Sequence, residues 1–401
     1  MFNYIPITFI IEVTQENYKL DFSESFNKFT TLHKLLESSS ANIPNESFLK
    51  KRDTELVPVL SNGKNAKYSR YSMPSNHFVG SNLWILKPTG MNRGNGIHVF
   101  KDITKLMQLI NESLSNVVTI KKVKQAEVTK NVDKKANEES KTKEEINTFN
   151  VEVTNHEQQK DDKIKKGEEG SKLKNNDGGK KEKTNKVMTR KFIIQKYIES
   201  PLLIRGRKFD IRSWVLITHD LNAYLFKEGY IRTSSSPFVI DLNDVDNKFV
   251  HLTNNAVQKY DENYGKFEDG NQLSFTQFQD YIDLVYPEKK VSVSNYLIPK
   301  MKNIIIKSIL ATRRYLNTEN RKYTFELFGY DFIVDSDFNI WLIEVNTNPC
   351  LEESSKVLRM LLPRMINDAL KLTVDVIFPP PIQSPRLAYP VTNYNDQENM
   401  W

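Results

Sequence analysis

Residues 328–335 (FGYDFIVD) and 340–349 (IWLIEVNTNP) form the most informative stretch of this 401-residue chain. Both runs are rich in β-branched and aromatic residues, and the polar residues 336–339 separate them, so we predict an antiparallel hairpin with those four residues as its loop. With that loop, Asp331 lies opposite Glu344, and cross-strand partners share one face of a sheet. Asn346 lies on the same face because side chains alternate along a strand.

Two carboxylates and an amide oxygen on one face form a set of hard oxygen ligands. Mg²⁺ that is bound together with substrate phosphates takes ligands of this kind. A surface hairpin with scattered acidic residues is the alternative interpretation, because it produces the same spacing. The rest of the chain has to decide between the two.

The overall composition predicts a globular protein of two or three domains, since 39% of the residues are hydrophobic and 11% are aromatic. No apolar run is long enough to span a bilayer, so we expect no membrane partner. The one cysteine, Cys350, allows no internal disulfide, which fits the reducing cytoplasm. No base is spaced to activate this cysteine, which favours a passive thiol over a nucleophile.

The net charge of +7 raises the question of a nucleic-acid partner, but most of the positive excess lies within residues 121–190. A protein that binds polyanions usually carries a basic face on its folded part, so we expect no nucleic-acid partner. Residues 121–188 are rich in Lys, Glu, Asn, Asp and Gly and contain almost no aromatic residue. Such a segment buries too little apolar surface to offset its ordering entropy, and we expect a disordered insertion.

The remaining elements alternate between strands and helices. Before the insertion we expect strands over residues 83–88 and 96–100 and an amphipathic helix over 102–114. After it we expect a strand over 191–198, a hairpin of 208–218 and 223–233, and helices over 274–285, 295–316 and 352–375. Hairpins with helices packed beside them indicate the α+β class. Residues 379–401 form a Pro-rich tail that we expect to be extended.

A glycine-rich segment, residues 87–96 (KPTGMNRGNG), joins two of the predicted strands. Glycines allow backbone N–H groups to approach phosphate closely, and Lys87 at the end of the strand could reach the phosphates. The P-loop pattern GxxxxGK[ST] is absent. An ordinary hairpin turn is the alternative, and a hairpin flap over nucleotide phosphates is the sharper interpretation.

The strand RKFDIRSWVL (207–216) places Lys208, Asp210 and Arg212 on one face, and the returning strand adds Arg232. Paired arginines suit bidentate recognition of a carboxylate or a phosphate. A solvated strand face with a cross-strand salt bridge would show the same pattern. The cluster HLTNN (251–255) has no second His or Cys at ligand spacing, so we predict no zinc site there.

These segments occur in an order that resembles the tubulin tyrosine ligase-like family over about residues 83–120 and 190–378. The matching motifs are WILKPTG (84–90), FIIQKYI (192–198), RKFDIRSWVL (207–216), KEGYIRTSS (227–235), HLTNNAVQK (251–259), FELFGYDFIVD (325–335) and WLIEVNTNP (341–349). The resemblance implies an ATP-grasp fold, in which two α+β lobes hold ATP and Mg²⁺ between them. It also implies a ligase that joins a free amino acid to tubulin.

The resemblance assigns roles residue by residue. Lys87 would contact the ATP phosphates, and the backbone of the strand segment Gln195, Lys196, Tyr197 and Ile198 would hold adenine. Lys208 and Asp210 would lie at the nucleotide, Arg212 and Arg232 would hold the amino-acid or acyl-phosphate end, and Thr253 and Asn254 would line the same cleft. Asp331, Glu344 and Asn346 would ligate Mg²⁺.

The family's domain organisation implies an N-terminal lobe over residues 1–80, which match the family only loosely, and central and C-terminal ATP-grasp lobes over 81–120 and 189–378. The expected partners are tubulin or microtubules with acidic C-terminal tails, and the expected locations are the cytoplasm and the cytoskeleton, with the cilium or basal body as a further possibility. We expect glutamate to be the amino acid, with glycine and tyrosine as alternatives. A microtubule-binding pseudoenzyme is the alternative from another class.

Overall fold

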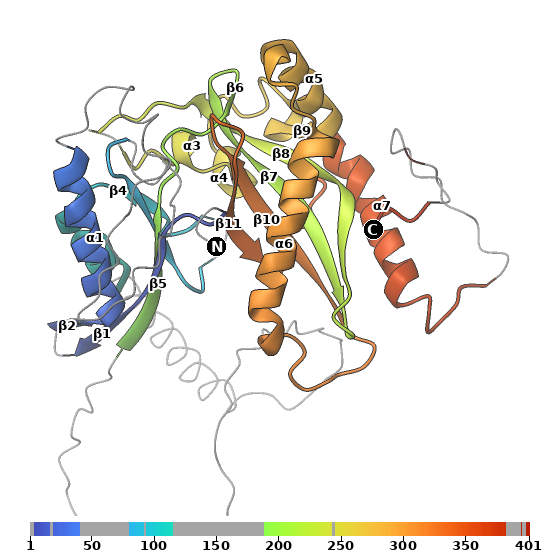
Figure 1. The fold of residues 1–401 in the computed structure, drawn as a ribbon, viewed down its shortest axis with the longest axis horizontal. Helices are drawn as coiled ribbons and strands as arrows, with labels where there is room; N and C mark the ends of the chain where they lie inside the picture. The colour runs from blue at the N-terminus through green and yellow to red at the C-terminus, as the bar shows by residue number, and fades with distance from the viewer. Residues whose placement is uncertain are drawn as a thin grey trace, which may run out of the picture.

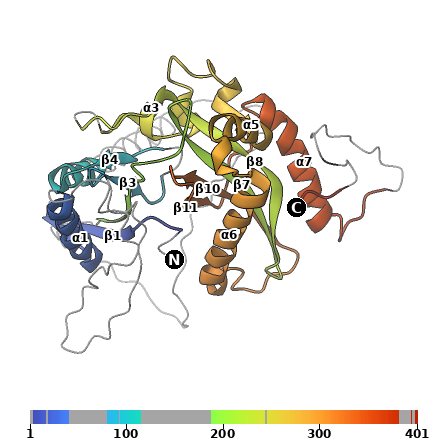
Figure 2. The ribbon, with the colours of Figure 1, turned by 45° about the horizontal axis from the view of Figure 1, so that its top comes forward.

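The computed structural model describes residues 4–16, 19–40, 80–91, 94–114, 188–242, 245–381, 394 and 398–401. Two antiparallel sheets with helices packed on them form two lobes, which lie side by side in Figures 1 and 2. Both views place α1 at one end of the molecule and α7 at the other. This arrangement confirms the expected α+β class. Among the described helices, none has the length and apolar character that crossing a bilayer requires.

The first lobe is built on a five-stranded sheet in the order β2-β1-β5-β3-β4. Its strands are β1 (Thr8–Glu16), β2 (Lys19–Phe22), β3 (Trp84–Pro88), β4 (His98–Phe100) and β5 (Met188–Lys196). Helix α1 (Glu24–Ser40) and a helix over residues 103–114 contribute to one apolar core with this sheet, in which Phe29, Trp84 and Leu106 are fully buried. The strands predicted on either side of the insertion are therefore neighbours, because β3 pairs with β5.

This sheet also crosses the expected boundary between an N-terminal lobe of residues 1–80 and a central lobe. Strand β1 pairs with β5 over eight residue pairs, from Thr8 with Gln195 to Gln15 with Met188. The described residues before position 80 and those after it therefore share one sheet and one core. The expected disordered insertion lies outside the described residues, apart from Met188 in β5.

The second lobe is built on a six-stranded sheet in the order β11-β10-β7-β8-β9, with β6 paired to β7. Its strands are β6 (Leu203–Ile204), β7 (Arg207–Thr218), β8 (Ala223–Pro237), β9 (Gln272–Ser274), β10 (Phe325–Val334) and β11 (Ile340–Asn346). The long hairpin predicted around residues 219–222 is thus present as β7 and β8. The short helices α3 (Lys248–His251) and α4 (Asn255–Gln258) follow β8 along the chain.

Helices cover both faces of the second sheet because its side chains alternate between two apolar cores. Phe209 and Ile211 point to a core shared with α5 (Phe275–Val285) and α6 (Ile298–Thr312). Trp214 points to the opposite core, shared with α7 (Lys356–Thr373). Ser274 caps α5 in a capping box and Ser355 caps α7, which explains why these helices begin where they do.

The hairpin of β10 and β11 has a longer loop than expected. Its last pair is Val334 with Ile340, so the loop contains the five residues 335–339 rather than four. A bulge between Asp331 and Phe332 then shifts the register by one residue, and Asp331 pairs with Glu344 as predicted. The predicted pairing of Asp331 with Glu344 is therefore confirmed. The bulge compensates for the extra residue in the loop.

Of the tail that was expected to be extended, residues 379–401, the structure describes residues 379–381, 394 and 398–401. Residues 398–401 pack against α7 and β8, and Met400 is fully buried. The Met400 carbonyl accepts a 2.8 Å hydrogen bond from the Lys227 N–H, and the Trp401 indole N–H donates to the Met365 carbonyl at 3.0 Å. The described C-terminal residues are therefore part of the folded second lobe.

Candidate active site

A cavity of about 60 Å³ lies between the two sheets. The first lobe contributes residues from β3, β5 and the segment that follows β5, and the second lobe contributes β7, β8, β10, β11 and the segment around α3. Twelve of the predicted site residues line it: Lys87, Gln195, Lys196, Tyr197, Ile198, Lys208, Asp210, Arg232, Thr253, Asn254, Asp331 and Glu344. The fold thus gathers residues that are as far apart in sequence as positions 87 and 344.

Asp331 is the electrostatic centre of this cavity. The residue is 1% exposed, and its carboxylate forms a bidentate ion pair with the Arg212 guanidinium through Nε and Nη2. The Arg232 Nη2 lies 2.8 Å from its Oδ2, and the Asn346 amide donates to the same oxygen at 3.2 Å. Although burial alone would raise the pKa of Asp331, the two arginines lower it to about 2. Asp331 is therefore a fixed negative charge at neutral pH.

Glu344 faces Asp331 across the strand pair but has no such partners among the described residues. Its side chain is open to solvent at the edge of the cavity. Partial desolvation and the nearby charge of Asp331 raise its pKa above the ordinary value, with Lys87 opposing the shift. Glu344 is thus the carboxylate of the pair that is free to bind an incoming cation.

Lys87 enters the cavity from the first lobe and contacts the second. Its Nζ donates to the Gln195 side-chain oxygen at 2.9 Å and to the Ile343 carbonyl at 3.2 Å. Ile343 is the residue that the bulge leaves without a pair in the register. Burial lowers the pKa of Lys87, and the charges of Glu344 and Asp331 oppose this shift. One cation therefore connects the two lobes beside the acidic pair.

A second carboxylate, Asp210, forms a parallel bidentate pair with Arg232, with both nitrogen–oxygen distances at 2.7 Å. Thr253 donates to the same carboxylate at 2.5 Å. Arg232 consequently bridges Asp210 and Asp331, and these charges raise its pKa well above the ordinary value against the effect of burial. The predicted Arg212 and Arg232 are thus both held by acidic residues that the sequence also predicted.

Lys208 belongs to a hydrogen-bonded chain that the sequence did not reveal. Its Nζ donates to the Tyr197 hydroxyl at 2.9 Å and to the His251 carbonyl at 2.8 Å. The Tyr197 hydroxyl and the His251 Nδ1 lie 2.8 Å apart. Burial lowers the pKa of Lys208 to about 7 and that of His251 to about 4. Neutral His251 and the Tyr197 hydroxyl therefore share a hydrogen bond, in which the tautomer of His251 decides which group donates.

In the segment expected to hold adenine, several hydrogen-bonding groups already bond to other groups of the protein. The Lys196 ammonium donates to Glu199 at 2.7 Å and to the Leu83 carbonyl at 3.0 Å, so its side chain has a structural partner. The backbone N–H groups of Lys196 and Tyr197 bond to the carbonyls of Ile7 and Leu83. A base bound here has to use other backbone groups, and Ile198 is the next residue that lines the cavity.

The glycine-rich segment connects β3 to β4 as an antiparallel hairpin, as predicted. Gly94 has a φ of 78° and packs so closely on Val257 of α4 that an added Cβ would lie 2.9 Å from it. A side chain there would be strained in both respects. The flap is thereby held against the second lobe, while Asn92 and Arg93 lie outside the described residues.

The donor set at the acidic pair fits Mg²⁺ in chemical type. Among the described residues no group of three or more His, Cys, Asp or Glu side chains could hold a metal ion. Asp331, Glu344 and Asn346 instead provide two carboxylates and an amide, which are hard oxygen donors. Glu344 is open to an ion, whereas Asp331 already accepts bonds from two arginines and Asn346. The residues fit an ion that is bound together with substrate oxygens.

Two α+β lobes with a charged cavity between their sheets agree with the expected ATP-grasp-like class of proteins. A family model described as the tubulin-tyrosine ligase family matches residues 14–384 of the chain. The chain belongs to this family, whose members are ATP-dependent ligases that modify tubulin.

Curated relatives match a shorter region. The chain is 40% identical to "Tubulin glycylase 3D" from Tetrahymena thermophila, over 47% of this chain and 18% of that protein. It is 37% identical to "Protein monoglycylase TTLL8" from Homo sapiens, over 46% and 22%. It is 30% identical to "Probable tubulin polyglutamylase TTLL9" from Rattus norvegicus, over 68% and 50%. The matched region thus spans half or less of each of these relatives.

Proposed function

We propose that this protein is an ATP-dependent ligase that joins an amino acid to tubulin by way of an acyl phosphate. The observation that carries the proposal is the opposition of charges across the cavity. Lys87 enters from the first lobe, and Asp331 and Glu344 belong to the second, with Arg212 and Arg232 behind them. Cations facing a pair of carboxylates suit a phosphoryl group that is transferred together with a divalent cation.

The reaction needs an activated carboxylate, because a free carboxylate is a poor electrophile. The γ-phosphoryl group of ATP passes to a carboxylate oxygen and ADP leaves. An amine then attacks the carbonyl carbon, expels inorganic phosphate and loses a proton. Mg²⁺, when bound at Glu344, Asp331 and Asn346, would supply charge neutralisation for the phosphates.

The chain's own residues would position and shield these groups. Lys87 and Lys208 line the cavity, while Arg212 and Arg232 are held by ion pairs with Asp331 and Asp210. Apolar residues of both lobes surround the cavity, including Ile85, Ile333 and Ile343. Such surroundings limit the access of water, which would otherwise hydrolyse an acyl phosphate. No activated nucleophile is required, which agrees with a role of Cys350 as a passive thiol.

The size of the cavity adds a requirement for movement. Its volume of about 60 Å³ is far below the roughly 300–1,000 Å³ of typical ligand pockets. The lobes or the lining side chains therefore have to separate before ATP can enter. The Lys87 bond to the Ile343 carbonyl spans this gap and would have to break in the same movement.

We propose glutamate as the amino acid, with glycine as the second candidate. The comparisons favour the second candidate in one respect, because the two glycylases are 40% and 37% identical to the chain and the polyglutamylase is 30% identical. Tyrosine is a further alternative. The basic segment 121–188, which lies outside the described residues, is a candidate for binding acidic tubulin tails. We place the reaction in the cytoplasm, at the cytoskeleton or the cilium.

The test is to incubate the purified chain with ATP, Mg²⁺ and tubulin, and with radiolabelled glutamate, glycine or tyrosine in separate reactions. We expect ATP-dependent label on tubulin in the glutamate reaction. Label only in the glycine or the tyrosine reaction would correct the amino acid and leave the ligase in place. If no label is incorporated although ATP binds, the pseudoenzyme interpretation holds instead.

A further inference from the structure

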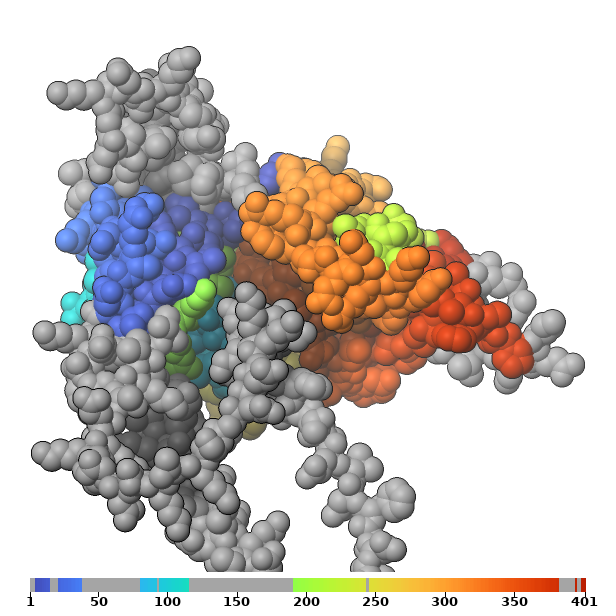
Figure 3. All heavy atoms as spheres, turned by 90° about the horizontal axis from the view of Figure 1, so that it is seen from below, coloured from blue at the N-terminus to red at the C-terminus, as the bar shows by residue number. Residues whose placement is uncertain are grey.

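The exposed side of helix α6 carries basic residues that do not line the active-site cavity. Between Glu288 and Glu319 the chain contains seven lysines and arginines and no acidic residue. Helix α6 and the turn that follows it, Arg313–Tyr315, occupy the second half of this stretch. Figure 3 shows this region, in orange, on the face seen from below. Because these basic residues lie on a folded helix, the spacing between their side chains is fixed. This spacing can be compared with the spacing of negative charges on a ligand.

Four exposed side chains form one line along this helix: Lys302, Ile306, Leu310 and Arg313. We call them the α6 face. Their spacing of three and four residues places them on one side of the helix, while Met301, Ile304 and Ile305 are buried on the other. Ile306 is 57% exposed and Leu310 is 63% exposed. The face thus has a cation at each end and two apolar side chains between them.

The cations of the α6 face are available. No acidic side chain of the described residues forms an ion pair with Lys302 or Arg313, in contrast to Arg321, which pairs with Glu319. Lys307 and Lys300 have other contacts, because they lie over the rings of Tyr4 and Tyr296. Lys302 and Arg313 are therefore the two cations of the α6 face itself, and next to them Arg314 lies over the Tyr315 ring.

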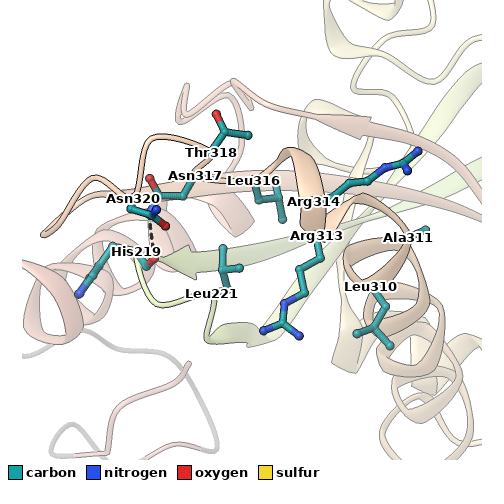
Figure 4. Close-up of a pocket in the computed structure, with 10 residues that line it drawn as sticks. All are labelled: His219, Leu221, Leu310, Ala311, Arg313, Arg314, Leu316, Asn317, Thr318 and Asn320. Atoms are coloured by element: carbon teal, nitrogen blue, oxygen red, sulfur yellow. Dashed lines mark hydrogen bonds between the residues drawn. The ribbon is translucent and has the colours of Figure 1, made fainter.

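A pocket of about 640 Å³ continues the α6 face at its C-terminal end. Figure 4 shows Leu310 and Arg313 on one side of it and Leu221 and His219, from the turn between β7 and β8, on the other. The loop that completes the pocket is fixed, because the Asn317 amide donates to the His219 carbonyl at 2.9 Å and to the Arg321 carbonyl at 3.0 Å. The pocket is thus a formed part of the surface and shares no lining residue with the active-site cavity.

We propose that the α6 face and this pocket bind an acidic segment of the protein substrate. Along α6 the distance from Lys302 to Arg313 is about 17 Å, which an extended peptide covers in about five residues. Glutamates spaced by that length would pair with the two cations, and the chain between them would contact Ile306 and Leu310. Nucleic acid offers no apolar stretch for these two side chains, and a second copy of the same face would bring like charges together.

The location connects the surface with the cavity. Lys307 of α6 lies over Tyr4, whose carbonyl accepts a 2.7 Å hydrogen bond from the Leu342 N–H of β11. Leu342 precedes the cavity residues Ile343 and Glu344 in the same strand. Helix α6 itself therefore lies close to the strand that carries Glu344. The inference rests on the proposed function only in assuming that the substrate is a protein.

The test measures binding without catalysis. A labelled peptide of about ten residues, rich in glutamate with leucine near its centre, is titrated with the full-length chain in the absence of ATP. The variant is Lys302→Glu with Arg313→Glu. The matched control is Lys34→Glu with Lys105→Glu, which reverses two exposed cations of the first lobe. We expect the variant to weaken binding at least about tenfold and the control to change it by less than about twofold.

Equal binding by the variant and the control would overturn the proposal. So would binding of a single-stranded oligonucleotide or of anionic lipid vesicles that exceeds peptide binding and is lost in the same variant. A failure of this proposal can be distinguished from a failure of the proposed function. Peptide binding with no amino-acid transfer refutes only the ligase, and transfer to intact tubulin at equal rates by variant and control refutes only the α6 face.

Discussion

Asp331 and Glu344 are paired across β10 and β11, yet the protein shifts their pKa values in opposite directions. Asp331 is buried against Arg212 and Arg232, which lower its pKa to about 2. Glu344 is open to solvent and has a raised pKa because desolvation and the charge of Asp331 disfavour its ionised form. One carboxylate therefore organises the arginines, and the other is available to a ligand.

Isosteric substitutions should separate these two tasks. Asp331→Asn leaves the buried Arg212 without its counter-charge, while Arg232 keeps Asp210. We expect it to lower the free energy of unfolding by about 3–5 kcal/mol. Glu344→Gln removes an exposed charge, and we expect the free energy of unfolding to change by less than about 0.5 kcal/mol. Urea denaturation of both variants checks this. Equal losses would mean that the buried ion pairs do not distinguish the two acids.

Lys208 should take up a proton when ATP binds. Its pKa is about 7 because burial disfavours the charge, so at pH 8 the free protein holds it mostly neutral. Phosphates beside it favour the ammonium form, and we expect an uptake that approaches about one proton at this pH. Calorimetry in two buffers of different ionisation enthalpy measures the uptake. The uptake should fall in Lys208→Met, and an unchanged value in that variant would contradict the assignment.

The same group gives the stability of the protein a defined pH dependence. The unfolded lysine keeps its proton up to its ordinary pKa of 10.5, whereas the folded one releases it near 7. The unfolded state therefore binds more protons between these two values, so the contribution of Lys208 to the free energy of unfolding rises with pH in this window. Urea denaturation at several pH values shows the rise as a slope that is absent in Lys208→Met.

Tyr197 should matter through its hydroxyl group. Tyr197→Phe removes an acceptor of Lys208 and the hydrogen-bond partner of the His251 Nδ1, and we expect a loss of about 1–3 kcal/mol in unfolding free energy. We also expect the KM for ATP to rise more than kcat falls, since Lys208 loses its position. Tyr264→Phe is the control, because that hydroxyl bonds to Asn255 outside the cavity. Equal effects of both variants on the KM would contradict this role.

The end of the chain should contribute to stability without affecting the site. Met400 is fully buried against α7 and β8, so Met400→Ala should lower the free energy of unfolding by about 2–5 kcal/mol. The control is Met360→Ala in α7, where the Met360 side chain is 38% exposed. It should lower the free energy of unfolding by less than about 1 kcal/mol. ATP affinity should remain unchanged in both. A Met400→Ala variant as stable as Met360→Ala would show that the C-terminal residues do not hold α7.

The sequence predicted the elements and most of the cavity because alternation along strands decides which side chains share a face. Lys208, Asp210 and Arg212 follow from such alternation; the first two line the cavity, and Arg212 lies behind it in an ion pair with Asp331. The pairing of Asp331 with Glu344 was also predicted, but from a loop of four residues. The actual loop has five residues, and a bulge that no residue pattern announced restores the register.

Contacts between segments that are distant in the sequence could not be predicted from strand alternation. His251 was visible as a polar residue with no metal-ligand spacing, but its contact with Tyr197 depends on how α3 lies beside the segment that follows β5. Lys196 lies in a motif that the family resemblance connects with adenine, yet its side chain pairs with Glu199 three residues later. Burial of Met400 depends on the return of the chain to β8, which a Pro-rich composition does not encode.

The central claim is that Lys87, Asp331 and Glu344 belong to a site where ATP cleavage drives amide-bond formation on tubulin. The most direct measurement counts ADP formed and amino acid attached to tubulin in the same reaction, for the wild-type chain and for Glu344→Gln. We predict equal amounts of the two products from the wild type and neither product from a Glu344→Gln variant that remains folded. Amino-acid attachment that persists in Glu344→Gln, or ADP formed without any attachment by the wild type, would contradict the account.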